Sequence, residues 1–234
     1  MRVGIMQPYF WPYLGYFQLI HSVDKFIIYD NIEYTKSGWF NRNRYLCNGQ
    51  DKYMTISIEK ASDYLDVKDR KVSANFDREK LKNQIEMSYR KAPFFNKIYP
   101  LFCQCVDYDS ENLFDYIYYS VKRITEYLGI DTEIIISSTL GIGRELKGKD
   151  KVIALCQKLE ADVYVNSIGG KSLYFKEDFE ENGLQLGFIQ MDKDIQYKQF
   201  DNEFIGALSI LDVLMFNSVE DVKALLERYT IEWS

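Results

Sequence analysis

The chain has 234 residues, of which 47% are apolar and 27% charged, and its formal net charge is −6 at pH 7. This length suits one domain with a substantial core, and the composition excludes an intrinsically disordered chain. The negative net charge excludes a general nucleic-acid-binding surface, so any phosphate site would have to be local.

The first thirty residues combine two strand patterns with one helix pattern. An apolar run over 3–6 predicts a strand, helical spacing over 13–22 predicts a helix, and a β-rich run over 25–29 predicts a second strand. This order favours a right-handed βαβ crossover, which places the loop 7–13 and Asp30 at the same carboxyl edge of a parallel sheet. Ligands bind at that edge in open α/β sheets.

The loop after the first predicted strand is rich in aromatic residues and proline. Pro8 and Pro12 fix φ and remove two backbone donors, so we expect a stiff loop that holds its aromatic side chains in place. The residues of this loop that we select as ligand contacts are Gln7, Tyr9 and Tyr13.

A β-hairpin is predicted over about 38–58, with its turn at Asn48-Gly49. Arg42 and Arg44 share one face of its first arm, so their side chains would stand about 7 Å apart and could clamp a diphosphate. A solvated hairpin face remains the alternative. Further candidate contacts in and before this arm are Tyr34, Lys36 and Asn43.

A helical insertion is predicted over about 77–129. Asp77 caps a helix that runs through Tyr89, Pro93 interrupts the pattern, and Gly129 ends it. Such an insertion either caps the carboxyl edge of the sheet or covers one of its faces, and the sequence leaves both open.

Two glycine-containing loops follow later strands. The loop 138–149 after the β run 133–137 contains Gly141 and Gly143, but the spacing of a P-loop is absent. The strand 161–166 leads into a second glycine loop and a helix predicted to begin at 171 or 172 and to run to about 180, an arrangement that aims backbone amides at an anion. A tight left-handed turn is the alternative, and the candidate contacts are Asn166, Gly169, Gly170 and Lys171.

The strand 184–190 would be the fifth parallel strand, and helices follow at 208–216 and 219–229. Strands and helices alternate, so we predict one α/β domain over 1–234: a three-layer Rossmann-like parallel sheet that carries the hairpin and the helical insertion.

The segment Tyr13-Leu14-Gly15-Tyr16 follows the first strand, where adenylyl- and cytidylyltransferases carry a His-x-Gly-His motif that it resembles. Gly15 would permit close approach of a nucleotide to the helix start, whereas Tyr13 and Tyr16 cannot supply an imidazolium. This nucleotidyltransferase-like comparison favours a nucleotide-binding site over nucleotidyl transfer.

The absence of certain sequence patterns limits the cellular compartment and the kinds of metal site that we expect. No stretch approaches the roughly 20 apolar residues of a membrane span, and no secretory signal pattern precedes the first strand, so we expect a cytoplasmic protein. The 4 cysteines lack zinc or disulfide spacing, and His21 is the single histidine, which excludes a histidine-rich metal site.

Several segments together resemble the WbqC-like family of bacterial proteins. They are 6–20, 26–30, 38–44, 164–174 and 208–214, which span nearly the whole chain. The resemblance implies a protein of surface-polysaccharide, O-antigen or lipopolysaccharide gene clusters that modifies a nucleotide-activated amino sugar by acyl or aminoacyl transfer.

Three hypotheses follow for the function. In the first, the chain is an acyl or aminoacyl transferase that binds a nucleotide-sugar, possible partners include an acyl carrier, and Asp30 or His21 is the acid–base group. In the second, Asp30 helps to place Mg²⁺ for nucleotidyl transfer. In the third, the chain is a non-catalytic nucleotide-sugar binding module. The sequence identifies no resident cofactor and leaves the oligomeric state open.

Overall fold

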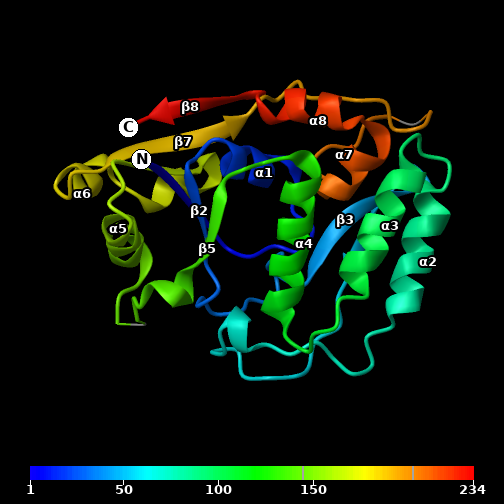
Figure 1. The fold of residues 1–234 in the computed structure, drawn as a ribbon, viewed down its shortest axis with the longest axis horizontal. Coiled ribbons are helices and arrows are strands. Elements are labelled where there is room, and N and C mark those ends of the chain that lie inside the picture. Colours follow the sequence, from blue (N-terminus) through cyan, green and yellow to red (C-terminus); the bar gives the residue numbers. More distant parts are fainter. Residues whose placement is uncertain (144, 202) are drawn as a thin grey trace.

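The computed structural model describes residues 1–143, 145–201 and 203–234, so Arg144 of the predicted loop 138–149 lies outside the described residues. Its main sheet has six strands in the order β5-β2-β1-β6-β7-β8 (Figure 1). The strands are β1 (Arg2–Met6), β2 (Lys25–Ile28), β5 (Glu133–Ile136), β6 (Val163–Ser167), β7 (Gln185–Met191) and β8 (Tyr229–Trp233).

Five of these strands are parallel, as the sequence predicts, and β8 pairs antiparallel with β7. β8 corrects the prediction of a helix through 229, because α8 ends at Leu226. The β-branched and aromatic residues of Tyr229–Trp233 pair with the free edge of β7 instead of continuing the helix.

The main sheet is covered by helices on both faces, which confirms the three-layer Rossmann-like arrangement. Val3 and Ile5 of β1 pack in one core with residues of α5 and α6. The opposite face packs against α1, α4 and α8. The helices are α1 (Leu14–His21), α4 (Leu113–Leu128), α5 (Gly148–Lys158), α6 (Lys176–Glu180) and α8 (Val219–Leu226).

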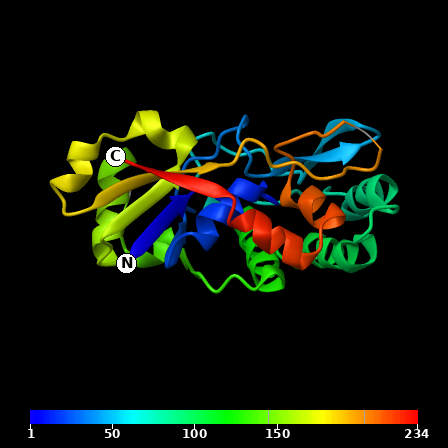
Figure 2. The same cartoon turned by 90° about the horizontal axis from the view of Figure 1, so that it is seen from above.

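The hairpin forms a separate two-stranded sheet of β3 (Arg42–Cys47) and β4 (Gln50–Thr55). Asn48 and Gly49 both have positive φ, 52° and 73°, as the predicted turn requires. Figure 2 shows β3 on the same side of the molecule as α2 (Arg78–Tyr89), α3 (Phe95–Val106) and α7 (Ile210–Phe216), away from α6.

The helical insertion has two parts, and its last helix has the second of the two roles that the sequence left open, cover for one face of the sheet. Its last helix, α4, ends just before β5 begins, so it runs back along the sheet and covers a face. Helices α2 and α3 pack instead against the hairpin and α7. The hydrogen bond from the Tyr89 hydroxyl to Asp212 of α7 (2.8 Å) joins these parts.

The predicted helix over 171–180 is replaced by two shorter elements. These are the 3-10 helix η3 (Ile168–Leu173) and α6. Tyr174 between them is extended (φ −133°), and its ring packs on Tyr164 of β6, with 5.8 Å between centroids. This contact pulls the chain back onto the sheet and interrupts the helix. Two further 3-10 helices, η1 (Val67–Asp69) and η2 (Ser137–Leu140), lie beyond β2 and β5.

Candidate functional site

The order of the strands reverses direction between β1 and β6. From β1 the chain moves to β2 and β5 on one side, and later to β6, β7 and β8 on the other. The loops after β1 and β6 therefore leave the carboxyl edge in opposite directions. Open α/β sheets bind their ligands at such a switch point, and we use the word crevice for the region between these two loops. The residues 7–13 and 166–171 flank it, so the sequence-predicted contacts of these two loops lie on either side of one crevice.

The loop after β1 is held in place by the hairpin. The side-chain amide of Asn43 donates hydrogen bonds to the carbonyl oxygens of Phe10 (3.1 Å) and Trp11 (2.7 Å). From α7, the Ser209 hydroxyl donates to the same oxygen of Trp11 (2.7 Å). Asn43 is buried by this role, so it supports the loop and does not present its amide to a ligand. Burial of Asn43 could not be foreseen from the hairpin pattern alone.

Tyrosines of the loop form a cluster at the start of α1. The fully buried Tyr16 donates its hydroxyl to the carbonyl of Gln7 (3.0 Å), and its ring lies 5.6 Å from that of Tyr9. Burial raises the pKa of Tyr9, Tyr13 and Tyr16 above the usual tyrosine value. These hydroxyls therefore stay protonated near neutral pH. Tyr9 and Tyr13 remain partly exposed, whereas Tyr16 is a core residue.

Gly15 has a different role from the one that the His-x-Gly-His comparison suggests. A Cβ at Gly15 would lie 2.5 Å from Cε2 of Tyr13. The Tyr13 ring itself occupies the space beside the glycine, so a nucleotide does not have that approach in this conformation.

Asp30 lies at the carboxyl end of β2 and is buried. Its Oδ1 accepts hydrogen bonds from the Ser137 hydroxyl (2.8 Å) and from the Ser138 backbone N–H (2.9 Å) at the end of β5. Ser138 and Asn31 also line a pocket of about 280 Å³. Asp30 itself does not line this pocket but lies behind it, at the predicted edge of the sheet.

The polar walls of this hollow come from residues that the sequence analysis did not select. Asp66 and Lys68 contribute from the segment around η1, which has no recognisable motif. On the neighbouring α5, Lys151 is buried with its ammonium 4.8 Å from the centre of the Tyr29 ring. Burial, together with Tyr174 and Asp66, raises the pKa of Tyr29 to about 12. No periodic pattern in the sequence predicts that these residues lie together, because they come from three segments that are distant in sequence.

The glycine loop after β6 is shaped by Asn166. The buried Asn166 accepts a hydrogen bond from the Ser167 N–H (2.8 Å), and a Cβ at Gly170 would lie 2.4 Å from its Nδ2. Gly170 is thus required by close packing. Gly169 and Gly170 both lack positive φ, so the left-handed turn considered as the alternative is wrong. The loop leads into a 3-10 turn, not an α-helix, and the exposed Lys171 pairs with Glu232 of β8.

The two hairpin arginines share one face, as their spacing predicts. Each guanidinium carbon lies 5.9 Å from the centre of the Trp39 ring. Arg42 donates to the carbonyl of Ser37 (2.9 Å), and Arg44 pairs with Asp51 (3.2 Å). A diphosphate would therefore compete with existing partners for these cations.

Three of the predicted residues do not join the crevice. His21 lies at the end of α1, at the opposite edge of the sheet, and its Nε2 is 2.6 Å from Glu227. Tyr34 is buried, and its hydroxyl donates to Asn41 (2.9 Å). Lys36 is exposed and pairs with Asp63 (3.2 Å).

Among the residues that the structure describes, no group of three or more His, Cys, Asp or Glu side chains could hold a metal ion. In the same residues, no helix combines the length and the apolar character needed to cross a bilayer.

Comparison with known proteins shows similarity along most of the chain. Residues 7–224 match the model of the WbqC-like protein family. A protein from Mycobacterium tuberculosis (strain ATCC 25618 / H37Rv), "Uncharacterized protein Rv1507c", is 30% identical over 222 residues, which cover 92% of this chain and 93% of that protein. No solved structure matches the chain.

Proposed function

Because the chain belongs to the WbqC-like protein family, we propose that it is an enzyme of surface-polysaccharide (O-antigen) biosynthesis. In this proposal it transfers an acyl or aminoacyl group to the amino group of a nucleotide-activated sugar. The observation that carries the proposal is the reversal of strand order between β1 and β6, because open α/β sheets bind their ligands at such a switch point.

The aromatic loop supports recognition of the sugar. Tyr9 is partly exposed and stays protonated near neutral pH, so it offers both a ring face and a hydrogen-bond donor to a sugar. Because Asn43 and Ser209 fix the loop, little ordering entropy would be lost on binding. Gln7 lies directly after β1 and is partly exposed, so its side-chain amide can bind sugar hydroxyls.

Cations near the crevice support recognition of the nucleotide phosphates. Lys171 and Arg44 hold exposed carboxylate partners, Glu232 and Asp51. Surface ion pairs of this kind contribute only about 0–1 kcal/mol, so a diphosphate can displace a carboxylate at small cost. Arg42 is bound to backbone carbonyls and keeps its full charge for a ligand.

The reaction that this arrangement would serve is amide formation from an acyl thioester. The sugar amine attacks the acyl carbonyl carbon, a C–N bond forms, and the bond from that carbon to the carrier sulfur breaks. The proton lost by the amine passes to Asp30 and then to the leaving thiolate. The hydrogen bonds that the described residues make to the carboxylate of Asp30 both end on Oδ1, which leaves Oδ2 for this exchange.

A thermal-shift panel of nucleotide-activated amino sugars tests the binding step. A ligand at about 100 times its dissociation constant adds about 2.7 kcal/mol, which raises the melting temperature of a chain of this size by about 5–10 °C. The shift should shrink in Lys171→Gln and in Tyr9→Phe. Lys97→Gln, on the exposed surface of α3, is the matched control and should behave as wild type.

Mass spectrometry of the sugar after incubation with an acyl thioester tests the transfer step. A gain of one acyl mass together with a free thiol supports the proposal. If the nucleotide-sugar raises the melting temperature but gains no acyl mass, the result would favour a non-catalytic binding module. Mg²⁺-dependent release of pyrophosphate from a nucleoside triphosphate would favour nucleotidyl transfer. Absence of any shift with nucleotide-sugars would overturn the proposal.

A further inference from the structure

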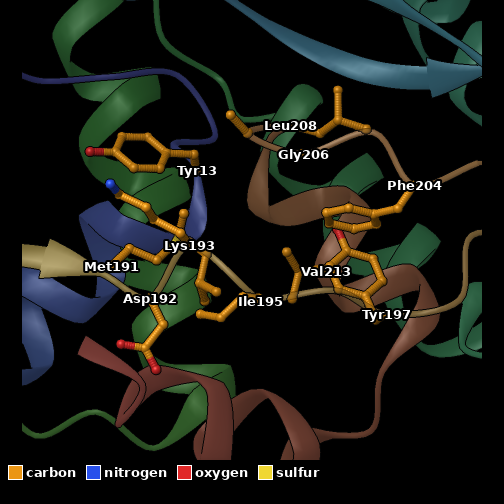
Figure 3. A pocket seen from close by; sticks show the side chains of 12 residues that line it. Tyr13, Met191, Asp192, Lys193, Ile195, Tyr197, Phe204, Gly206, Leu208 and Val213 are labelled. Atoms are coloured by element: carbon orange, nitrogen blue, oxygen red, sulfur yellow. The ribbon is translucent and has the colours of Figure 1, made fainter.

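A second pocket of about 130 Å³ lies at the same carboxyl edge, on the β7 side of the crevice (Figure 3). It is enclosed by the start of α1, the end of β7 and the segment 192–209 that leads to α7. Tyr13 of the aromatic loop forms part of its wall, so the pocket is continuous with an element that also flanks the crevice.

The lining of this pocket is mostly apolar. Leu14, Ile195, Leu208 and Val213 contribute aliphatic side chains, and Phe204 closes one end. This contrasts with the hollow beside Asp30, whose lining includes the polar side chains of Asp66, Lys68 and Ser138. An apolar pocket of this kind favours hydrocarbon over a sugar or a phosphate.

The volume restricts the size of the ligand. A cavity of about 150 Å³ lined by aliphatic and aromatic side chains holds one benzene molecule. A pocket of about 130 Å³ is therefore large enough for a chain of about four to six carbons, and too small for a long fatty acyl chain.

One end of the pocket carries a positive charge. Asp192 at the rim pairs with Arg228 (3.3 Å), whereas Lys193 forms no ion pair with any residue that the structure describes. In Figure 3, the Lys193 ammonium and the Tyr13 hydroxyl both point away from Phe204, toward the same end of the pocket. A ligand whose hydrocarbon lies inside would place a negative or polar end there.

The wall formed by the segment 192–209 is anchored from behind. The Tyr197 hydroxyl donates to Oδ2 of the buried Asp212 (2.7 Å), and the Gln199 amide donates to the same oxygen (2.6 Å). Gln199 also accepts from the Ile205 N–H (2.7 Å), which closes the loop. The pocket is therefore held in shape by buried hydrogen bonds, as a ligand site requires.

We propose that this pocket binds a short acyl chain of about four to six carbons whose carboxylate or thioester carbonyl lies at Lys193. This inference rests on the proposed function in one respect: the bound acyl chain would be part of the acyl donor in the proposed transfer reaction. The shared chemistry is an apolar chain that ends in an acyl oxygen able to accept a hydrogen bond from Lys193, supplied either by a free carboxylate or by a phosphopantetheine thioester.

Isothermal titration calorimetry with butyrate, hexanoate, decanoate and hexanol tests the pocket on the full chain. We expect hexanoate to bind most tightly, hexanol about fivefold more weakly because it lacks the charge, and decanoate not to fit. S-hexanoyl-phosphopantetheine is the second arm. Tighter binding of this thioester than of hexanoate assigns the pocket to a carrier-bound chain, and the reverse assigns it to a free acid.

Two variants locate the binding. Gly206→Leu fills the pocket from its exposed rim, where an added Cβ meets only Phe204 at 3.4 Å, and should abolish hexanoate binding. Lys193→Gln should weaken it about fivefold. Lys198→Gln is the matched control, because this lysine lies on the same segment but outside the pocket and pairs with Asp201 (3.5 Å).

Wild-type affinity for hexanoate in both Gly206→Leu and Lys193→Gln would overturn the inference, as would equal affinity for hexanoate and decanoate. If Gly206→Leu fails to fold, the affinity of Lys193→Gln for hexanoate alone tests the inference. The probes contain no nucleotide, so loss of nucleotide-sugar binding in the separate panel would remove the proposed function without changing these results.

Discussion

The side-chain amide of Asn43 lies 2.7 Å from the carbonyl oxygen of Trp11 and donates a hydrogen bond to it. This contact fastens the hairpin to the aromatic loop that begins at Gln7. Trp11 itself has a positive φ of 46°, an unfavourable conformation for a bulky residue that surrounding contacts must maintain.

Asn43→Ala should lower the free energy of unfolding by about 2 kcal/mol, because the buried carbonyls of Phe10 and Trp11 lose a donor. Urea unfolding followed by circular dichroism measures this change. Asn96→Ala, at an exposed position of α3, is the control and should change the stability little. Equal stability of the two variants would contradict the anchoring role of Asn43.

Gly170→Ala and Gly169→Ala should differ although the residues are adjacent. The added Cβ at Gly170 meets Nδ2 of Asn166 at 2.4 Å, whereas the nearest atom at Gly169 is 4.0 Å away. We expect Gly170→Ala to cost about 1–3 kcal/mol and Gly169→Ala to be nearly neutral by thermal unfolding. Combining Gly170→Ala with Asn166→Ala should recover part of the lost stability. If it does not, the contact with Asn166 is not the cause of the destabilisation.

Asp30→Asn should reduce the rate of acyl transfer by about 10²–10⁴-fold, the usual contribution of a general base. His21→Gln is the matched control, because His21 lies at the opposite edge of the sheet, beside Glu227. A coupled assay of thiol release measures both rates. A larger loss in His21→Gln than in Asp30→Asn would reverse this assignment.

Asp212 should give the stability a characteristic pH dependence. Burial raises the pKa of its carboxyl above the usual value, and the hydroxyls of Tyr197 and Tyr89 oppose this shift only in part. The folded state therefore retains the proton to higher pH than the unfolded chain, whose carboxyl titrates near ~4. As pH rises between the two pKa values, the folded state binds more protons and the free energy of unfolding falls.

Asp212→Asn removes this titration, so its free energy of unfolding should depend less on pH from about 4 upward. Urea unfolding at a series of pH values from about 4 to 7 provides the comparison. Asp201→Asn, whose carboxylate is exposed on the segment before α7, should keep the wild-type slope. If the free energy of unfolding of wild type and of Asp212→Asn depended on pH in the same way, the Asp212 carboxyl would have the same pKa in the folded and unfolded states.

Local patterns were sufficient to predict much of this fold. The βαβ order of the first thirty residues, the Asn48-Gly49 turn and the helices predicted over about 77–129 follow from periodicity and turn chemistry, and the structure contains each of them. The strand β8 was missed, although its β-branched and aromatic residues carry a signal, because the helix pattern of α8 runs directly into it.

The candidate site was less predictable because it depends on contacts between distant segments. Alternation predicts that Asn43 and Arg44 face opposite ways, but not that the aromatic loop covers Asn43. Likewise, nothing local marks Lys193 as the rim of an apolar pocket or Lys68 as the wall of a polar one. The burial of a polar residue is decided by its partners, and these lie far away in the chain.

The hydrogen bond from Ser209 to Trp11 joins residues separated by 198 positions. During synthesis on the ribosome, the aromatic loop emerges long before α7, which completes its support. Contacts of such long sequence separation form late, since a long chain must close before they contribute. The aromatic loop of the nascent chain therefore lacks this support until α7 has been translated, and a chain that stops before Ser209 would not form the hydrogen bond to Trp11.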